Sequence, residues 1–160
     1  MPRVLFVCTG NTCRSPMAEA FFRRRLKASV RGESWEVGSA GTRPIDGSSA
    51  TGSTVAAMRA YGLDLGSHRA GCVSAELLAR YDLILTMEAG QLEALRIEFP
   101  GAAPRVQLFS DAAGSGGDVA DPIGQPPEVY QAVAAEIEAL IEQGFDRLCQ
   151  LALTLGASAV

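Results

Sequence analysis

Short apolar runs alternate with stretches of helical spacing along the whole chain, and this alternation limits the fold more than any other feature. Four segments read as strands: "RVLFV" (3–7), "SWEVGSAG" (34–41), "DLILTM" (82–87) and "RVQLF" (105–109). Helical patterns begin at Ser15, lie within 48–63, cover 74–81 and 88–99, and resume after 128 as one long amphipathic helix. Strands that alternate with helices predict an α/β fold, in which a four-stranded parallel sheet is flanked by helices on both faces.

The boundaries of these elements follow from capping and breaking residues. We expect Ser15 to cap the first long helix, with Pro16 as its first residue, and Gly62 to end the second. Gly144 interrupts the last helix at a cost of about 1 kcal/mol relative to alanine, which predicts close packing or a bend. The length of 160 residues predicts one domain, 1–160, with a frayed end at 156–160.

Composition excludes several classes of function. The net charge is −4, and the only basic run, 23–25, fits a solvated helix face better than a nucleic-acid patch. The chain contains no run of 18 apolar residues, so no membrane span is expected. Its first residues resemble a core strand and not a signal peptide, and we expect a cytoplasmic protein, which is also expected to be a monomer. One histidine and four cysteines without a CxxC pair predict neither a metal site nor a disulfide framework, and no cofactor is expected.

The turn after the first strand, "VCTGNTCRSP" (7–16), carries the residues that indicate chemistry. Ligands bind at the carboxyl ends of parallel strands, where a following helix offers unpaired N–H groups and a partial positive charge. The turn lacks the glycine-lysine pattern of a nucleotide-binding loop and the glycine pattern of a dinucleotide-binding turn. We expect its main-chain amides to surround a tetrahedral oxyanion; the residues of this phosphate-binding loop are Thr9, Gly10, Asn11, Thr12, Cys13 and Arg14.

A thiol and a guanidinium in one such turn predict phosphoryl transfer. Arg14 can clamp two oxygens of the anion, and Cys8 would lie at the floor of the loop, in line for attack on phosphorus. The positive surroundings are expected to lower the pKa of the Cys8 thiol, and Ser15 can donate a hydrogen bond to its sulfur. Cys8 by itself would be read as a buried core thiol, but the other loop residues favour a nucleophile.

The reaction also needs an acid for the leaving group, and the long loop 111–127 is the place to look for one. Asp121, stiffened by Pro122, is the best candidate, and Asp111 and Asp118 are its competitors. His68 reads more naturally as a structural residue.

The remaining cysteines have less definite roles. Cys13 is either buried filler or a resolving thiol that protects Cys8 by a reversible disulfide. Cys72 and Cys149 are expected to be inert.

With "SAGT" (39–42) and "DP" (121–122), the loop makes residues 3–150 resemble the low-molecular-weight protein-tyrosine phosphatase family. The resemblance implies Cys8 as nucleophile, Arg14 as phosphate clamp, Asn11 and Ser15 as supports of the loop and the thiolate, and Asp121 as general acid and then base. It implies a four-stranded parallel sheet, a phosphorylated protein as substrate, and no metal or cofactor.

Two positions depart from the tyrosine-specific pattern and are similar to the bacterial protein arginine phosphatases of this family. Thr12 stands where an aliphatic residue is usual, and Ile123 stands where an aromatic residue usually follows Asp-Pro. In that branch the loop threonine polarises the attacking water, so phosphoarginine is favoured over phosphotyrosine. Tyr61 or Tyr130 could still supply an aromatic wall. Less favoured interpretations are an arsenate reductase and a non-catalytic anion-binding module.

Overall fold

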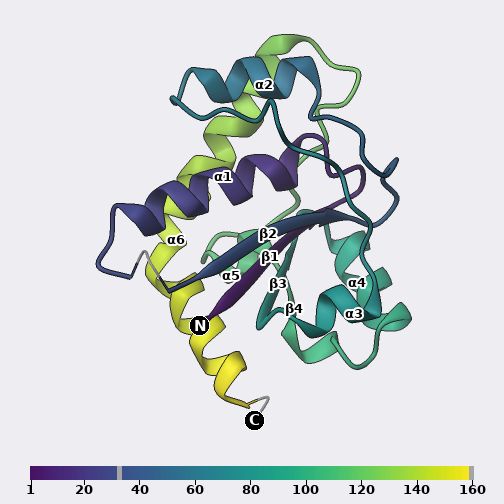
Figure 1. Ribbon diagram of the computed structural model, residues 1–160, viewed down its shortest axis with the longest axis vertical. Helices are drawn as coiled ribbons and strands as arrows, with labels where there is room; N and C mark the ends of the chain where they lie inside the picture. Colours follow the sequence, from purple (N-terminus) through teal and green to yellow (C-terminus); the bar gives the residue numbers. More distant parts are fainter. Residues whose placement is uncertain (32–33, 159–160) are drawn as a thin grey trace.

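The computed structural model describes residues 1–31 and 34–158, and in this part of the chain all four strands of the sheet run parallel (Figure 1). The strands are β1 (Arg3–Cys8), β2 (Glu36–Gly41), β3 (Leu83–Thr86) and β4 (Val106–Leu108), in the spatial order β2-β1-β3-β4. The four-stranded parallel sheet expected from the sequence is therefore confirmed, and its strands begin and end within two residues of the expected limits.

Helices connect the strands, as the alternating pattern predicts. They are α1 (Arg14–Lys27), α2 (Gly52–Arg59), α3 (Ala75–Ala79), α4 (Ala89–Glu98), α5 (Phe109–Ala112) and α6 (Pro127–Ser158), with a 3₁₀ turn η1 (Ala103–Arg105). The short α5 was missed, because four residues at the start of a Gly-rich loop show no helical period. The helix α6 continues through Ser158, beyond the expected start of fraying at 156, and 159–160 lie outside the described residues.

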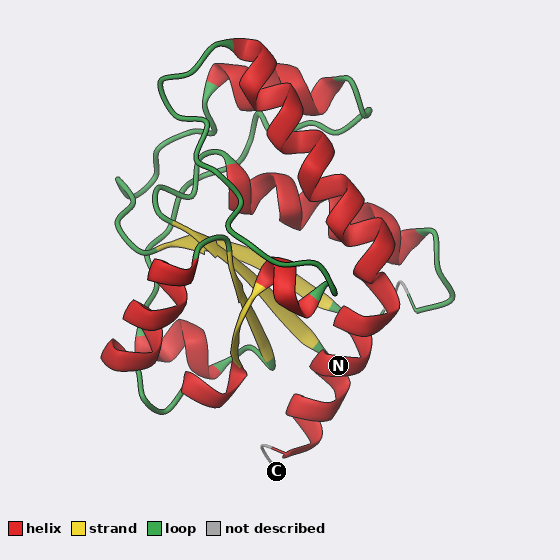
Figure 2. Cartoon of the chain, turned by 180° about the vertical axis from the view of Figure 1, so that it is seen from behind, coloured by secondary structure: helices red, strands yellow, loops and turns green. Residues whose placement is uncertain are grey.

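Alternate residues of the central strand β1 face opposite layers, as the strand period of two requires. Val4, Phe6 and Cys8 belong to the core cluster that includes α1, α5 and α6, whereas Leu5 and Val7 belong to the cluster with α3 and α4. The two views of the chain agree that α1 and α6 lie on one side of the sheet and α3 and α4 on the other (Figures 1 and 2). Helices therefore cover both faces, as expected.

The first long helix starts earlier than its sequence suggests. α1 begins at Arg14, and its N-cap, Cys13, makes no side-chain capping bond. The prediction that Ser15 caps the helix and that Pro16 is its first residue is wrong. The Ser15 hydroxyl lies 3.0 Å from the Cys8 sulfur instead, so a side chain that could have capped the helix serves the site.

The long helix α6 packs closely on the rest of the molecule. A Cβ atom on Gly144 would lie 2.6 Å from the Cα of Ala113, so the glycine permits close packing, one of the two roles expected for it. Within the described residues no helix is long and apolar enough to cross a bilayer.

Three ion pairs join α6 and the α1 region, and the first two use the predicted basic run 23–25: Arg24–Glu138 at 2.6 Å, Arg25–Glu142 at 3.2 Å and Arg31–Asp146 at 2.7 Å. Arg23 pairs with Glu19 at 2.9 Å, so all three arginines of the run bind carboxylates of the same chain.

Candidate active site

Cys8 is the last residue of β1, at the point where the chain changes direction across the sheet. After β1 the chain passes to β2 on one side and then crosses to β3 on the other, and such switch points open a crevice at the carboxyl ends of the strands. A cavity of about 200 Å³ lies there. Its lining residues are Cys8, Thr9, Gly10, Thr12, Cys13, Arg14, Asp121 and Ile123. The cavity thus brings the predicted nucleophile, clamp, acid and specificity residues together.

The phosphate-binding loop is held in an unusual conformation by Asn11. This residue has a φ of +55°, a left-handed value that asparagine tolerates better than most side chains. Its Oδ1 accepts a hydrogen bond from the Gly71 N–H at 3.0 Å, and its carbonyl accepts one from His68 Nε2 at 2.6 Å. His68 therefore supports the loop from outside, in agreement with the structural role expected for it.

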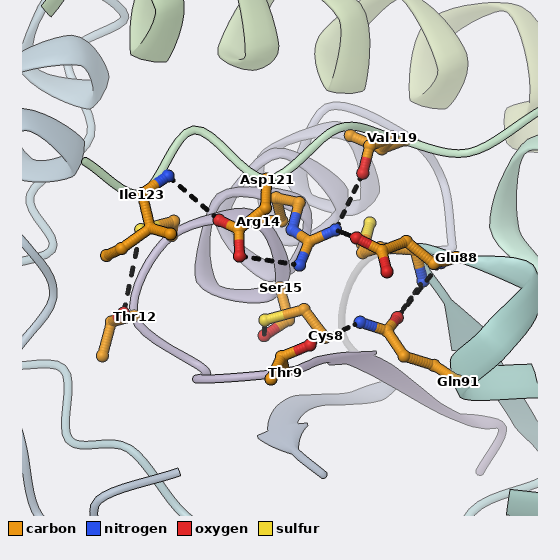
Figure 3. A network of polar contacts seen from close by, with 12 residues as sticks. Cys8, Thr9, Thr12, Arg14, Ser15, Glu88, Gln91, Val119, Asp121 and Ile123 are labelled. Atoms are coloured by element: carbon orange, nitrogen blue, oxygen red, sulfur yellow. Dashed lines mark hydrogen bonds and ion pairs between the residues drawn. The ribbon is translucent and has the colours of Figure 1, made fainter. Parts of the chain in front are cut away.

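A short relay of hydrogen bonds connects Asn11 to the nucleophile, and its last step, from Ser15 to Cys8, is drawn in Figure 3. Because Asn11 Oδ1 accepts from a main-chain N–H, its Nδ2 must be the donor to the Ser15 hydroxyl, at 2.8 Å. Ser15 then has its own proton to donate, and Cys8 Sγ is 3.0 Å away. The Asn11 N–H also donates to this sulfur, at 3.3 Å. A donor at either contact would favour a thiolate, and the supporting roles of Asn11 and Ser15 stay predictions.

Burial nevertheless raises the pKa of the Cys8 thiol above its ordinary value, because a thiolate loses solvation in the core. The hydrogen bonds from Ser15 and Asn11 and the charge of Arg14 act in the opposite direction. The expectation of a lowered pKa was therefore wrong, since it counted the cationic neighbours and left out desolvation.

Arg14 is only 1% exposed, and its guanidinium has one nitrogen, NH1, held by hydrogen bonds and one edge, Nε–NH2, that contacts only Asp121 among the described residues and is called the open edge below. Its NH1 donates to a Glu88 carboxylate oxygen and, at 2.8 Å, to the carbonyl of Val119. Its NH2 lies 3.4 Å from Asp121 Oδ2, and its Nε is buried without a partner among the described residues. A buried N–H that lacks an acceptor is costly, so the Nε–NH2 edge is suited to an oxyanion that supplies two acceptors.

Asp121 lies opposite Cys8 on the loop that leads from α5 to α6. Its Oδ1 accepts a hydrogen bond from the Ile123 N–H at 3.1 Å, and its side chain is 38% exposed (Figure 3). The competitor Asp118 is used elsewhere, because its Oδ1 accepts from the first N–H of α4, Ala89, at 2.8 Å. Asp111 is in the first turn of α5. Of the three aspartates, only Asp121 lines the cavity with Cys8 and Arg14.

The cavity has no aromatic wall among the described residues. Tyr61 packs edge-on against Phe21 with ring centroids 4.9 Å apart, and Tyr130 is buried and 4% exposed. Neither tyrosine lines the cavity, so neither replaces the missing aromatic residue. Ile123 lines it and is 55% exposed.

Cys13 lies beside two hydroxyl groups. Its sulfur is 3.7 Å from Thr12 Oγ1 and 3.6 Å from Thr51 Oγ1. Cys8 and Cys13 are both reduced and buried, and a resolving role for Cys13 stays a prediction.

Sequence reasoning missed two residues at the start of α4. Glu88 is the N-cap of this helix and binds Arg14, and Gln91 Nε2 donates to Thr9 Oγ1 at 3.0 Å. They follow β3, the strand next to β1, so their place at the carboxyl edge of the sheet was the signal that could have found them.

Comparison with known proteins agrees with this geometry. A family model described as "Low molecular weight phosphotyrosine protein phosphatase" matches residues 3–151. The chain belongs to this family. A protein-arginine-phosphatase from Geobacillus stearothermophilus is 36% identical over 147 residues, which cover 91% of this chain and 95% of the relative.

A low molecular weight protein-tyrosine-phosphatase from Streptomyces coelicolor is 41% identical over 124 residues, covering 73% of this chain and 74% of the relative. The crystal structure of a low molecular weight protein tyrosine phosphatase from T. tengcongensis superposes with a TM-score of 0.86 at 40% identity, covering 92% of this chain and all of the other. The protein is therefore a cysteine-based phosphoprotein phosphatase of the low molecular weight family.

Proposed function

We propose that this phosphatase hydrolyses phosphorylated protein side chains through a phosphocysteine intermediate and prefers phosphoarginine. The single observation that carries the chemistry is the cavity in which Cys8 Sγ, the open edge of Arg14 and the Asp121 carboxyl meet. Cys8 and Arg14 come from adjoining elements, whereas Asp121 comes from a loop more than 100 residues later in the chain. A module that only binds anions would need Arg14 and the loop amides but neither of the other two groups.

The first step transfers the phosphoryl group to the enzyme. The amides of the loop and the Nε–NH2 edge of Arg14 bind the phosphoryl oxygens, and the Cys8 thiolate attacks phosphorus from the floor. The S–P bond forms as the bond from phosphorus to the leaving nitrogen or oxygen breaks. Protonated Asp121 gives its proton to that leaving atom and becomes a carboxylate.

The second step releases phosphate. The Asp121 carboxylate takes a proton from a water molecule, whose oxygen attacks phosphorus. The O–P bond forms, the S–P bond breaks, and Cys8 leaves as a thiolate. Asp121 is protonated again, so both groups return to their starting states and inorganic phosphate is the product.

The preference for phosphoarginine rests on what surrounds the cavity. A phenyl ring is best held by other aromatic rings, and the residues that line this cavity include none. A phosphoguanidinium is planar and rich in N–H donors, so acceptors such as the carbonyl oxygen of the Asp121 carboxyl group and the Thr12 hydroxyl suit it better. The relative from Geobacillus, which the chain matches over almost its full length, carries the name of an arginine phosphatase.

A comparison of kcat/KM on phosphoarginine and phosphotyrosine peptides tests this preference. We expect wild type to favour phosphoarginine and Thr12→Ile to shift the ratio toward phosphotyrosine, because the substitution removes a polar group from the cavity wall. An unchanged ratio in Thr12→Ile would refute the role of Thr12. The second candidate, phosphotyrosine, is favoured by the relative from Streptomyces, and a wild-type preference for phosphotyrosine peptides would select it.

A further inference from the structure

Thr9, the residue after the nucleophile, has a hydroxyl group whose direction is determined from another part of the chain. Thr9 lines the catalytic cavity, and its Oγ1 lies 3.0 Å from Nε2 of Gln91, in the first turn of α4 (Figure 3). Gln91 is only 6% exposed, so water does not compete freely for its amide. The contact links the residue after β1 to the helix that follows the neighbouring strand β3, at the carboxyl edge of the sheet.

The polarity of this contact is forced. Gln91 Oε1 accepts hydrogen bonds from two main-chain N–H groups, those of Met87 and Glu88, each at 3.1 Å. A main-chain N–H can only donate, so this end of the amide must be the oxygen and the other end must be the NH₂ group. Gln91 therefore donates to Thr9 Oγ1, and Thr9 accepts.

Thr9 then keeps its own hydroxyl proton for a different partner. Among residues 1–31 and 34–158, Gln91 Nε2 is the protein group that hydrogen-bonds to Thr9 Oγ1, and none accepts from it. A similar arrangement lies on the other side of Cys8, where Asn11 donates to Ser15 and the Ser15 proton is left for the Cys8 sulfur at 3.0 Å or the Ala40 carbonyl at 3.4 Å. In both cases a buried amide orients a hydroxyl of the loop.

We propose that the Thr9 hydroxyl is an additional hydrogen-bond donor to a phosphoryl oxygen of the bound substrate, and that Gln91 is the positioning residue that aims it. The inference rests on the proposed phosphatase chemistry, since it places a phosphoryl group in the cavity. It does not depend on the preferred substrate, because phosphoarginine, phosphotyrosine and inorganic phosphate all present the same oxygens. A donor at this position would gain nothing from a substrate guanidinium, which carries only donors.

Competitive inhibition by inorganic phosphate, measured during hydrolysis of p-nitrophenyl phosphate, tests the contact. We expect Thr9→Val, which replaces the hydroxyl by a methyl group of similar size, to raise the inhibition constant about tenfold, the weight of one hydrogen bond to a charged oxygen. Thr9→Ser keeps the hydroxyl and is expected to restore the wild-type inhibition constant. Thermal unfolding of each variant separates this effect from a loss of fold.

Gln91→Glu tests the positioning role. A carboxylate still accepts from the two main-chain N–H groups, but its second oxygen cannot donate, so it attracts the Thr9 proton away from the cavity. We expect a rise in the inhibition constant similar to that in Thr9→Val. The added negative charge also repels phosphate and raises the inhibition constant by itself. Gln91→Glu is therefore also made in the Thr9→Val background, where only this charge effect remains.

The outcomes are distinct. Phosphate inhibition that is equal in wild type and Thr9→Val, with p-nitrophenyl phosphate still hydrolysed, overturns the donor role of Thr9. Equal effects of Gln91→Glu in the two backgrounds overturn its action through Thr9. If wild type hydrolyses neither p-nitrophenyl phosphate nor a phosphopeptide, the proposed function itself fails.

Discussion

Gly41, the last residue of β2, is expected to be essential for catalysis although it carries no functional group. A Cβ atom on Gly41 would lie 2.5 Å from the carbonyl oxygen of Thr9 and 3.2 Å from the N atom of Asn11. The "SAGT" segment therefore lies directly against the phosphate-binding loop. The next two N–H groups, of Thr42 and Arg43, donate to the carbonyls of Cys8 and Thr9 at 2.9 and 3.0 Å, so the two segments cannot simply separate.

The Gly41→Ala substitution has a magnitude that can be worked from these distances. The Thr9 carbonyl must retreat by about 0.9 Å to reach ordinary contact at 3.4 Å. A displacement of about 1 Å in catalytic groups costs about 100-fold in rate, whereas overpacking costs about 1–3 kcal/mol of stability. Since a domain is stable by about 5–15 kcal/mol, the variant stays folded while kcat/KM falls by about two orders of magnitude.

Gly38→Ala is the matched control, because it lies on the same strand and its Cβ meets the ring of Tyr81, away from the loop. Thermal unfolding and kcat/KM on a phosphopeptide are measured for both variants. We expect both to lose stability and only Gly41→Ala to lose activity per folded molecule. A Gly41→Ala enzyme whose kcat/KM is within threefold of wild type would show that the loop tolerates this displacement, and the reasoning would be refuted.

Three further predictions concern packing, titration and the acid. Gly144→Ala is expected to lower the free energy of unfolding in urea by about 1–3 kcal/mol, because the new Cβ meets the backbone of Ala113. Gly90→Ala, whose Cβ would have no atom within 4 Å, should not destabilise the protein. Equal effects of the two substitutions would contradict the packing argument. Burial raises the pKa of Cys149 from 9.0 to about 11, so the folded state retains that proton more tightly than the unfolded state. The stability that this proton adds is complete below pH 9 and is lost as the pH rises toward 11. Between pH 8.5 and pH 10.5, the free energy of unfolding of wild type should therefore fall by up to about 2 kcal/mol more than that of Cys149→Ala. Asp121→Asn should lower kcat/KM, which reports formation of the phosphocysteine, by about 100-fold or more on phosphoarginine peptides and by less on p-nitrophenyl phosphate, whose leaving group departs without a proton; equal losses in kcat/KM would argue against an acid role.

Ser15 illustrates how far local patterns reach. The sequence predicts a helix at this point, and the helix is present, but the preference of serine for helix starts led to the wrong prediction that Ser15 is the N-cap. The side chain instead lies between Cys8 and Asn11, because a hydrogen bond to a buried sulfur is available only after β1 and α1 pack together. The pKa of Cys8 was misjudged for the same reason, since desolvation depends on what covers the thiol.

Contacts between distant parts of the chain could not be predicted from the sequence, as three residues show: Glu88, Gln91 and Val119. Each contacts a residue of the phosphate-binding loop that is more than 70 positions away in the chain. No spacing rule links residues at such separations, and only the sheet order β2-β1-β3-β4 brings them to one edge.

The sequence by itself determined the parallel sheet, the loop after β1 and the pairing of a thiol with a guanidinium, because these depend on periodicity and on residues within one turn of chain. The tertiary structure alone decided which nitrogen of Arg14 remains open, which aspartate lines the cavity and which hydroxyl protons point into the site. Those properties depend on buried partners from distant segments, and the free energy of a buried hydrogen bond is not encoded in either partner separately.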